Sequence, residues 1–255
     1  EVMSQPWEIY DALLDGLPDD VVVRTAGQGP RWSRVLNSAG GVGTAWTMDV
    51  RSRPALSGDG PLDGRPLRDV GALAKSWNLA EASIGQAAIN SWYSREQTAA
   101  ANGFEPTGEG LTWRQVFDPY REMIVGKRVA VIGHFPFAEA ALAGAGEYIC
   151  LERNLQPGDW PDSACEYVLP ECDLVFISSS SFVNKTAPRL IELSRQAHTV
   201  LVGPSTPLNP VLLDYGVDTI TGFIAASSLS DPASLAEMVP AGDIGPGFRV
   251  HRHRA

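Results

Sequence analysis

The chain has 255 residues, of which 44% are hydrophobic and 20% are charged, so it can bury one large core or two modest ones, as soluble globular proteins do. Its formal net charge of −10 argues against a nucleic acid or an anionic membrane as a partner, because binding phosphate groups requires a basic face. No apolar run approaches the roughly 18–20 residues needed to span a bilayer, and the first residues lack a charged-then-apolar secretory pattern, so we expect a cytoplasmic protein.

The first hundred residues predict a small α+β unit. Residues 6–17 place apolar side chains at helical spacing, and three short strands without intervening helices follow, which predicts an antiparallel meander. The strands are expected at residues 21–23, 31–36 and 43–48, ahead of an irregular loop at residues 51–65. Two more helices are predicted at residues 67–77 and 79–93. The second is so rich in small side chains that we predict very close packing against a neighbouring element.

Residues 101–110 have the composition of a linker, so we predict a domain boundary there. The first domain, residues 1–108, is the α+β unit, and the second, residues 109–255, is a Rossmann-like α/β domain. In the second domain, strand and helix alternate, which predicts a mostly parallel sheet with right-handed crossovers. Strands are expected at residues 129–132, 148–152, 174–178, 199–202 and 217–220, and helices at residues 112–125, 137–145 and 188–196. We interpret the basic cluster at residues 249–254 as a solvated tail.

The turns after the predicted parallel strands carry polar residues and glycines. The carboxyl ends of parallel strands meet at one edge of a sheet, where ligands of such folds bind, so we expect these turns to converge. The candidate ligand-binding residues there are Gly133, His134, Phe135, Pro136, Glu152, Ser179, Asn184, Lys185, Ser205 and Thr206.

Several of these residues have a specific chemistry. Glu152 ends its strand 19 positions after Gly133, where an acid grips the ribose hydroxyls in dinucleotide-binding folds, although it could also be a surface carboxylate. The turn does not read Gly-x-Gly-x-x-Gly, which disfavours standard nicotinamide binding. His134 could ligate a metal or transfer a proton near neutral pH, or be hydrogen-bonded within the turn. Lys185 could hold an anion or be solvated, and Asn184 could cap the next helix.

Three carboxylates lie close together in the sequence at Asp159, Asp162 and Glu166. Several oxygens at short range can bind a hard cation, whereas Asp162 could instead be the N-cap of a helix. The three cysteines match neither a zinc knuckle nor a disulfide framework, so we interpret them as reduced, mostly buried thiols. They are Cys150, Cys165 and Cys172.

Several sequence blocks occur in the order typical of one family. They include Gly40-Gly-Val-Gly43, Ser76-Trp77-Asn78, Ala82-Ser-Ile-Gly85, Val131-Ile-Gly-His-Phe-Pro136, Gly158-Asp-Trp-Pro-Asp162, Asn184-Lys-Thr186 and Gly203-Pro-Ser-Thr-Pro207. On these residues the chain resembles the bacterial and archaeal proteins called putative heavy-metal-chelation proteins. The resemblance implies a domain like the amino-terminal domain of enolase, joined to a Rossmann-like domain, with the site in the cleft between them. It also implies that Asn90 faces that site.

Three functions are compatible with these observations. In the first, the cleft binds, and could turn over, a divalent metal ion or a small metal-chelating molecule, with His134, Glu152 and Asp162 as metal ligands and with Asn90 and Lys185 orienting the ligand. In the second, the protein is an enzyme that uses S-adenosylmethionine or a nucleotide, with Glu152 on the ribose. In the third, it is a non-catalytic sensor or interaction protein. A homodimer through the exposed meander is compatible with all three.

Overall fold

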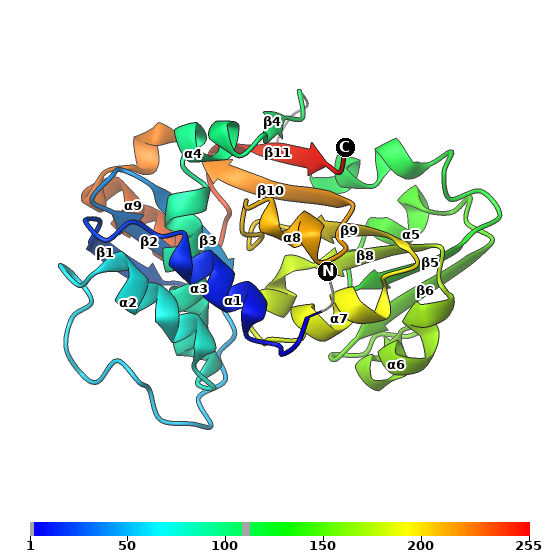
Figure 1. Ribbon diagram of the computed structural model, residues 1–255, viewed down its shortest axis with the longest axis horizontal. Helices are drawn as coiled ribbons and strands as arrows, with labels where there is room; N and C mark the ends of the chain where they lie inside the picture. Colours follow the sequence, from blue (N-terminus) through cyan, green and yellow to red (C-terminus); the bar gives the residue numbers. More distant parts are fainter. Residues whose placement is uncertain (1–2, 109–112) are drawn as a thin grey trace.

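A computed structural model of the protein describes residues 3–108 and 113–255. Within these residues the chain forms two sheets, one in each half of the molecule (Figure 1). The strands are β1 (Val23–Gln28), β2 (Trp32–Asn37), β3 (Val42–Trp46), β4 (Glu105–Pro106), β5 (Arg128–Ile132), β6 (Glu147–Glu152), β7 (Trp160–Pro161), β8 (Leu174–Ser178), β9 (His198–Val202), β10 (Thr219–Ala225) and β11 (Gly247–His253). The α-helices are α1 (Glu8–Asp15), α2 (Leu67–Gly71), α3 (Leu79–Tyr93), α4 (Glu96–Ala101), α5 (Ala138–Ala141), α6 (Cys165–Val168), α7 (Ala187–Leu193), α8 (Val211–Asp214) and α9 (Pro232–Met238). None of these helices is long and apolar enough to cross a lipid bilayer.

The large sheet is built outward from β5. Its residues Val129, Ala130 and Val131 are fully buried, with Ala130 in one core cluster and the two valines in another, because both faces of the sheet are covered. The strand order is β4-β11-β10-β9-β8-β5-β6-β7, and the pairs from β7 to β10 are parallel. The expected mostly parallel α/β sheet is confirmed. The order reverses at β5, so the topological switch point lies between β5 and β8, where such folds bind ligands.

The small sheet is the predicted antiparallel meander, in the order β1-β2-β3. Helix α3 lies against β2 and β3 and, on another side, against the 3₁₀ turn Ala72–Lys75, and one glycine in each contact permits the close approach of the backbones. A Cβ on Gly43 would lie 1.8 Å from the carbonyl oxygen of Ala87 in α3, and one on Gly85 would lie 2.1 Å from the backbone nitrogen of Ala74. The close packing predicted from the small side chains of residues 79–93 is therefore confirmed.

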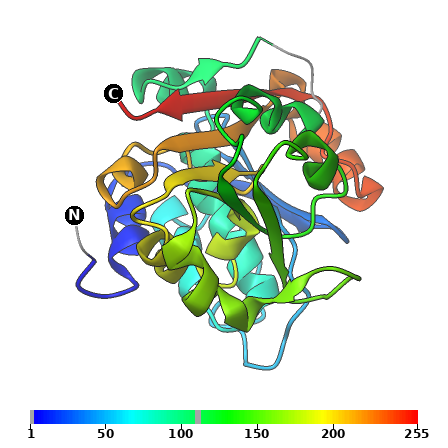
Figure 2. The ribbon, with the colours of Figure 1, turned by 90° about the vertical axis from the view of Figure 1, so that its right-hand side faces the viewer.

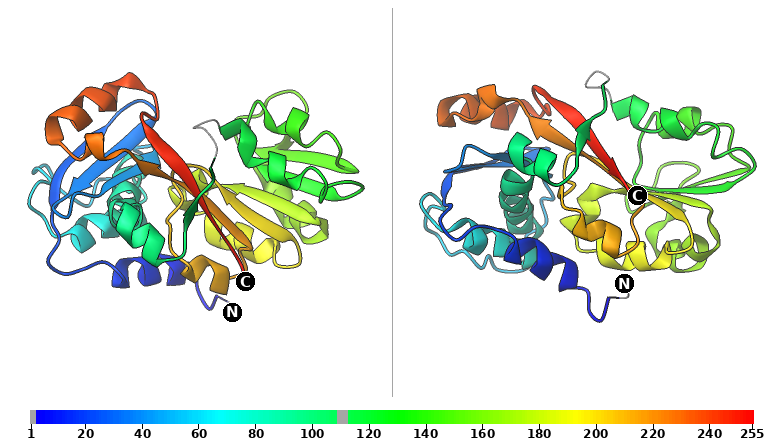
Figure 3. Two further views of the ribbon diagram at one scale, coloured as in Figure 1. Left: turned by 90° about the horizontal axis from the view of Figure 1, so that it is seen from above. Right: turned by 45° about the horizontal axis from the view of Figure 1, so that its top comes forward.

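Residues 227–246, from the second half of the chain, return to cover the other face of the meander (Figure 3). Arg34 of β2 is fully buried there, and its Nη2 donates to the carbonyl oxygens of Asp243 and Ile244, at 2.8 and 2.7 Å. Burial lowers the pKa of Arg34, and the charge of Asp243 opposes this effect. Leu36 and Leu235 share a small apolar cluster in the same place. The sequence analysis expected an exposed meander, but this face of the meander is covered.

The basic end of the chain is not a solvated tail, which corrects the interpretation of residues 249–254. It belongs to β11, which pairs antiparallel with β10 along its whole length and with β4 on its other side. Figure 2 shows β4, β11 and β10 following one another along that border of the sheet. Val250 and Arg249 are buried, at 1% and 3% exposure. The burial of these residues depends on pairing with β10, which is distant in sequence. The basic composition of residues 249–254 taken alone therefore predicted that they are exposed to solvent.

Three other local predictions are wrong or incomplete. The helix expected at residues 112–125 is two short 3₁₀ turns, Trp113–Val116 and Asp118–Tyr120, because Pro119 lacks the N–H that a continuous helix needs; residue 112 lies outside the described residues. The helix expected at residues 137–145 shortens to α5. The expected linker at residues 101–110 contains β4. Residues 109 and 110 of that linker lie outside the described residues, and so does the start of the predicted second domain at residue 109.

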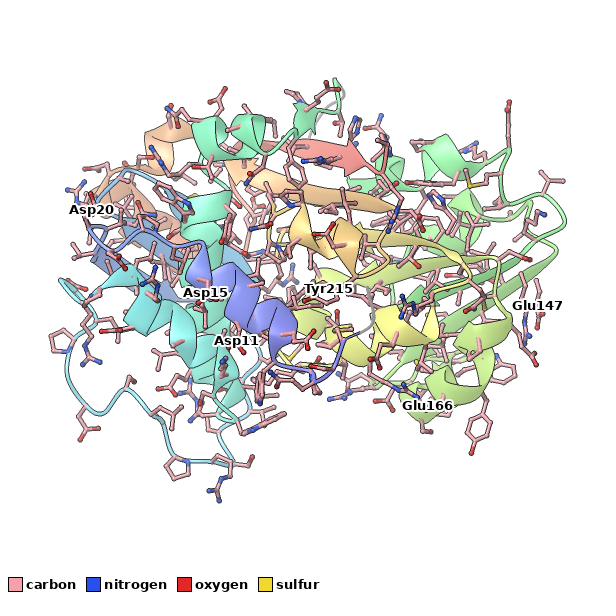
Figure 4. All side chains as sticks on the ribbon, viewed as in Figure 1. Asp11, Asp15, Asp20, Glu147, Glu166 and Tyr215 are labelled. Carbon is pink, nitrogen blue, oxygen red and sulfur yellow. The ribbon has the colours of Figure 1, made fainter. Side chains whose placement is uncertain are left out.

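Helix α1 joins the two halves. The hydroxyl of Tyr10 donates to the carbonyl oxygen of Phe182 at 2.6 Å, and Tyr10 is fully buried. On the same side, the hydroxyl of Tyr215 lies 3.4 Å from Glu8, and Figure 4 shows Tyr215 beside α1. Because α1 contacts both halves, it helps to fix their relative position.

Candidate metal centre

The turns after β5 and β6 meet, as the sequence predicted. One carboxylate oxygen of Glu152 accepts a hydrogen bond from the backbone N–H of His134 at 2.9 Å, and the other accepts from Arg153 at 2.7 Å and from Asn154 at 3.2 Å. Glu152 therefore accepts hydrogen bonds from backbone N–H groups of both turns and so links the two turns. Gly133 adopts a φ of 103°, which favours glycine, and a Cβ there would lie 3.0 Å from the Ser178 side chain.

The side chain of His134 lies in a cluster of three potential metal ligands. Its Nδ1 is 3.2 Å from the carboxylate of Asp159 and 3.9 Å from Sγ of Cys150, and the donor atoms of all three residues lie within 4.8 Å of one another. The register of the sheet explains the contact: β7 pairs in parallel with β6, with Trp160 opposite Leu151, so the preceding residues Asp159 and Cys150 are level with each other. Two residues from neighbouring strands thus meet a histidine from the next turn.

The cluster is largely buried, and its charges are coupled. The Asp159 side chain is 3% exposed and that of His134 28%. Burial disfavours the charged form of Asp159, but hydrogen bonds from the backbone of Gln156 and from the side chains of Cys150 and His134 outweigh this and hold its pKa below the ordinary value. Burial raises the pKa of the Cys150 thiol to about 12, and the nearby Asp159 carboxylate adds to the effect. Without a cation, the site therefore keeps an ionised carboxylate beside a neutral thiol.

The three donors suit a transition-metal ion. Imidazole nitrogen, thiolate sulfur and carboxylate oxygen are the ligands that zinc and similar ions take in proteins. With metal–ligand bonds of about 2.0–2.3 Å, donors at the corners of a tetrahedron are about 3.3–3.6 Å apart, close to the 3.2 and 3.9 Å found around His134 Nδ1. The partly exposed His134 leaves one side of the cluster accessible. Three protein ligands with an accessible fourth position are typical of metal sites that bind further molecules.

Of the metal ligands predicted from the sequence, the structure places only His134 in this cluster. Glu152 is engaged with backbone N–H groups, and Asp162 pairs with Nε of Arg153 at 2.8 Å. Glu166, the third member of the acidic group, pairs with Arg189 at 2.8 Å, and Figure 4 shows it at the surface. Within the described residues, Asp159 is thus the member of that acidic group that reaches the histidine.

Four predicted ligand-binding residues lie in the interior instead of facing a cleft. Asn90 is fully buried, and its Nδ2 donates to the carbonyl oxygens of Thr44 and Ser205, at 2.9 Å each, so it ties β3 to the turn after β9. The Ser205 hydroxyl accepts from the backbone N–H of Trp46 at 2.8 Å. Thr206 is fully buried and its hydroxyl donates within its own turn. Ser179, at 1% exposure, is the fourth.

The aromatic part of the first turn is structural. Phe135 packs edge-on against Phe117, with ring centroids 5.7 Å apart, and Pro136 is exposed at the turn before α5. The Asn184 side chain accepts from the N–H and the hydroxyl of Thr186. These bonds close a local turn before α7. The N-cap of α7 is Thr186 and receives no side-chain capping hydrogen bond, so the helix capping by Asn184 that was the alternative to ligand binding is not observed.

Lys185 and Asn184 lie beside a cleft of about 490 Å³ between the two halves. Its lining residues from the first half are Val50, Ser52, Arg53, Trp77 and Leu79, and those from the second half are Arg153 and Asn184. The amine of Lys185 donates to the carbonyl oxygen of Ser76 at 2.5 Å and lies 4.8 Å from the centre of the Trp77 ring. Burial lowers the pKa of Lys185 to about 8.

Cys150 was missed as a metal ligand at the level of sequence, and Asp159 was named only as part of an acidic group, without its contact to His134. Cys150 and Cys165 look alike there, since both are free and buried. One signal was present: Cys150 stands two residues before Glu152 on a strand, so both side chains point to the same face of the sheet. The contact with Asp159 carried no local signal, because it depends on the pairing of β6 with the two-residue strand β7.

Comparisons with known proteins agree with this architecture. A family model described as "putative heavy-metal chelation" matches residues 115–249, and a second model with the same description matches residues 10–93. A crystal structure of a protein of unknown function from Desulfitobacterium hafniense is 37% identical, with a TM-score of 0.84 over 97% of this chain and 98% of that one. A second protein of unknown function, from Pyrococcus horikoshii, is 21% identical and shares the fold, with a TM-score of 0.76 over 98% and 99% of the two chains. No curated protein matches the chain significantly.

Proposed function

The chain belongs to the family described as putative heavy-metal chelation, and from this premise we propose that it binds a divalent transition-metal ion through His134, Cys150 and Asp159. One observation carries the proposal: the imidazole, thiol and carboxylate donors of these residues lie within 4.8 Å of one another. A neutral imidazole, a thiolate and a carboxylate together balance the charge of a divalent cation.

The proposal extends to the cleft between the halves. Arg153 lines the cleft, and its backbone N–H donates to Glu152, which in turn accepts from the backbone of His134. The cleft and the cluster therefore share one pair of turns. The described lining residues of the cleft do not include His134, Cys150 or Asp159. We propose that a small metal-chelating ligand binds in the cleft, next to the turns that carry these residues, and that the ion they would hold would supply an electrophile for its turnover.

Titration with cobalt(II) tests the ion site, because a thiolate ligand gives cobalt a charge-transfer absorption that imidazole and carboxylate do not. Metal-stripped wild-type protein is expected to bind cobalt well below the millimolar range and to show this absorption. The Cys150→Ser variant is expected to lose the absorption, and His134→Ala and Asp159→Asn to weaken binding by at least about tenfold, or about 1.4 kcal/mol.

Matched controls separate this ligand set from the alternatives. Cys165→Ser removes another buried thiol, and Asp162→Asn removes the neighbouring carboxylate that pairs with Arg153. Both variants are expected to bind cobalt as the wild type does. Loss of binding in Asp162→Asn together with an unchanged spectrum in Cys150→Ser would contradict the proposal.

A further inference from the structure

The cleft between the halves is of the size that takes a small molecule, and both halves build it. Its volume is about 490 Å³, within the range of sites for small ligands. Arg53 and Trp77 come from the first half, and Arg153 and Asn184 from turns at the carboxyl edge of the large sheet. A ligand that fills it would therefore contact both halves at once.

The charged groups that line the cleft are cationic. Arg53 and Arg153 both line it, and its described lining residues include no carboxylate. Arg153 pairs with Asp162 through Nε, while within the described residues the Arg53 guanidinium has no carboxylate partner. Although the chain has a net charge of −10, these two arginines produce a locally positive electrostatic potential that attracts anions. Guanidinium groups bind carboxylate and phosphate oxygens with particularly good geometry.

Beside these arginines stands an exposed aromatic ring that is held in place. Trp77 is 56% exposed, although a large aromatic side chain is normally buried. Its ring packs on Trp7, with centroids 6.0 Å apart, and the Lys185 amine lies 4.8 Å from the ring centre. Lys185 has a φ of 66°, in the left-handed region that costs free energy for a non-glycine residue. The ring therefore offers a positioned apolar surface to the cleft.

We infer that the cleft binds a small ligand that combines a planar ring with an oxyanion, the ring against Trp77 and the oxyanion between Arg53 and Arg153. The ring would gain stacking energy on the tryptophan, and the oxyanion would receive charge-assisted hydrogen bonds from both halves. The inference deepens the proposed function and rests on it in one respect, that a second acidic group of the ligand would reach the metal ion. The recognition of ring and oxyanion needs no metal.

Calorimetry on metal-stripped protein tests the inference with two probes, pyridine-2,6-dicarboxylate and adenosine 5′-monophosphate, which carry the oxyanion as carboxylate or as phosphate. At least one is expected to bind and to quench tryptophan fluorescence, and the one that binds identifies the oxyanion. The neutral pyridine-2,6-dicarboxamide is expected to bind at least about tenfold more weakly. Arg53→Gln and Arg153→Gln are each expected to weaken binding by about tenfold or more, since a hydrogen bond to a charged group is lost.

Two further variants control for indirect effects, and a third tests the role of the ring. Arg51→Gln removes a neighbouring exposed arginine that pairs with Asp49 and does not line the cleft, so it is expected to leave affinity unchanged. Asp162→Asn frees Arg153 from its ion pair and is expected to preserve or strengthen binding. Trp77→Leu keeps an apolar side chain but removes the ring, so it is expected to weaken the ring-bearing probe severalfold while leaving the melting temperature near that of the wild type.

The inference is overturned if neither probe binds, or if binding is the same in wild type, Arg53→Gln and Arg153→Gln. Its failure is distinguishable from that of the metal site. Probe binding that persists in His134→Ala, without any cobalt absorption in the wild type, rejects the metal site alone. A normal cobalt spectrum in a protein that binds neither probe rejects the cleft ligand alone.

Discussion

Replacing Asn90 by alanine should destabilise the protein without altering the proposed metal site. The Asn90 amide is fully buried, and its Nδ2 bridges the carbonyl oxygens of Thr44 and Ser205 at 2.9 Å each, while its Oδ1 accepts from Gln86 at 3.1 Å. Alanine would leave these buried groups short of a partner at a cost of about 1–3 kcal/mol for each unsatisfied group. Since a carbonyl keeps a second lone pair for other donors, we expect a total loss of about 2–4 kcal/mol.

Urea denaturation followed by far-ultraviolet circular dichroism measures this loss. The matched control is Asn154→Ala, an exposed asparagine for which we expect a change within about 0.5 kcal/mol. Cobalt binding by folded Asn90→Ala protein should equal that of the wild type, because the amide contacts none of the three metal ligands. If Asn90→Ala unfolds at the urea concentration of the control, or if it loses metal while remaining fully folded, then our assignment of Asn90 to the contact between the halves is wrong.

Three further outcomes are expected. Lys185 has a pKa of about 8 in the folded chain against 10.5 in the reference state, so the unfolded chain binds more protons between these pH values. The free energy of unfolding of the wild type, relative to that of Lys185→Gln, should therefore rise by about 1–3 kcal/mol from pH 8 to 10.5. If urea denaturation shows the same difference between the two proteins at both pH values, the lowered pKa is contradicted. Gly85→Ala should lower the melting temperature strongly, because the new Cβ would lie 2.1 Å from a backbone atom. Gly144→Ala is the control and should not lower it, because its Cβ would meet no atom closer than 4.0 Å. Equal melting temperatures of the two variants would argue against the close packing of α3. Arg34→Met removes two hydrogen bonds to residues 227–246 and should speed limited proteolysis within that segment, so an unchanged cleavage rate would show that other contacts hold it.

Much of the fold was predictable because its signals are local. The apolar run of β5, the turn residues between the meander strands and the small side chains of α3 each reflect an immediate environment, and all three predictions are confirmed. Where the prediction failed, the determinant was either a single proline or a distant partner. Pro119 breaks the helix expected at residues 112–125. The basic strand β11 is buried only because β10 and β4 pair with its two edges.

For the candidate site, the sequence by itself placed Gly133 and His134 in a turn at the carboxyl end of a buried parallel strand, which is where we predicted the chemistry to lie. It could not determine which donors meet His134, because side chains converge through strand register and not through spacing in the chain. The tertiary structure alone decided that the parallel pairing of β6 with β7 brings Cys150 and Asp159 to the imidazole, while Asp162 is drawn to Arg153 and Glu152 to the backbone. A change of one residue in that register would turn Asp159 to the opposite face of the sheet, so the proposed set of metal ligands depends on the fold and not on spacing in the chain.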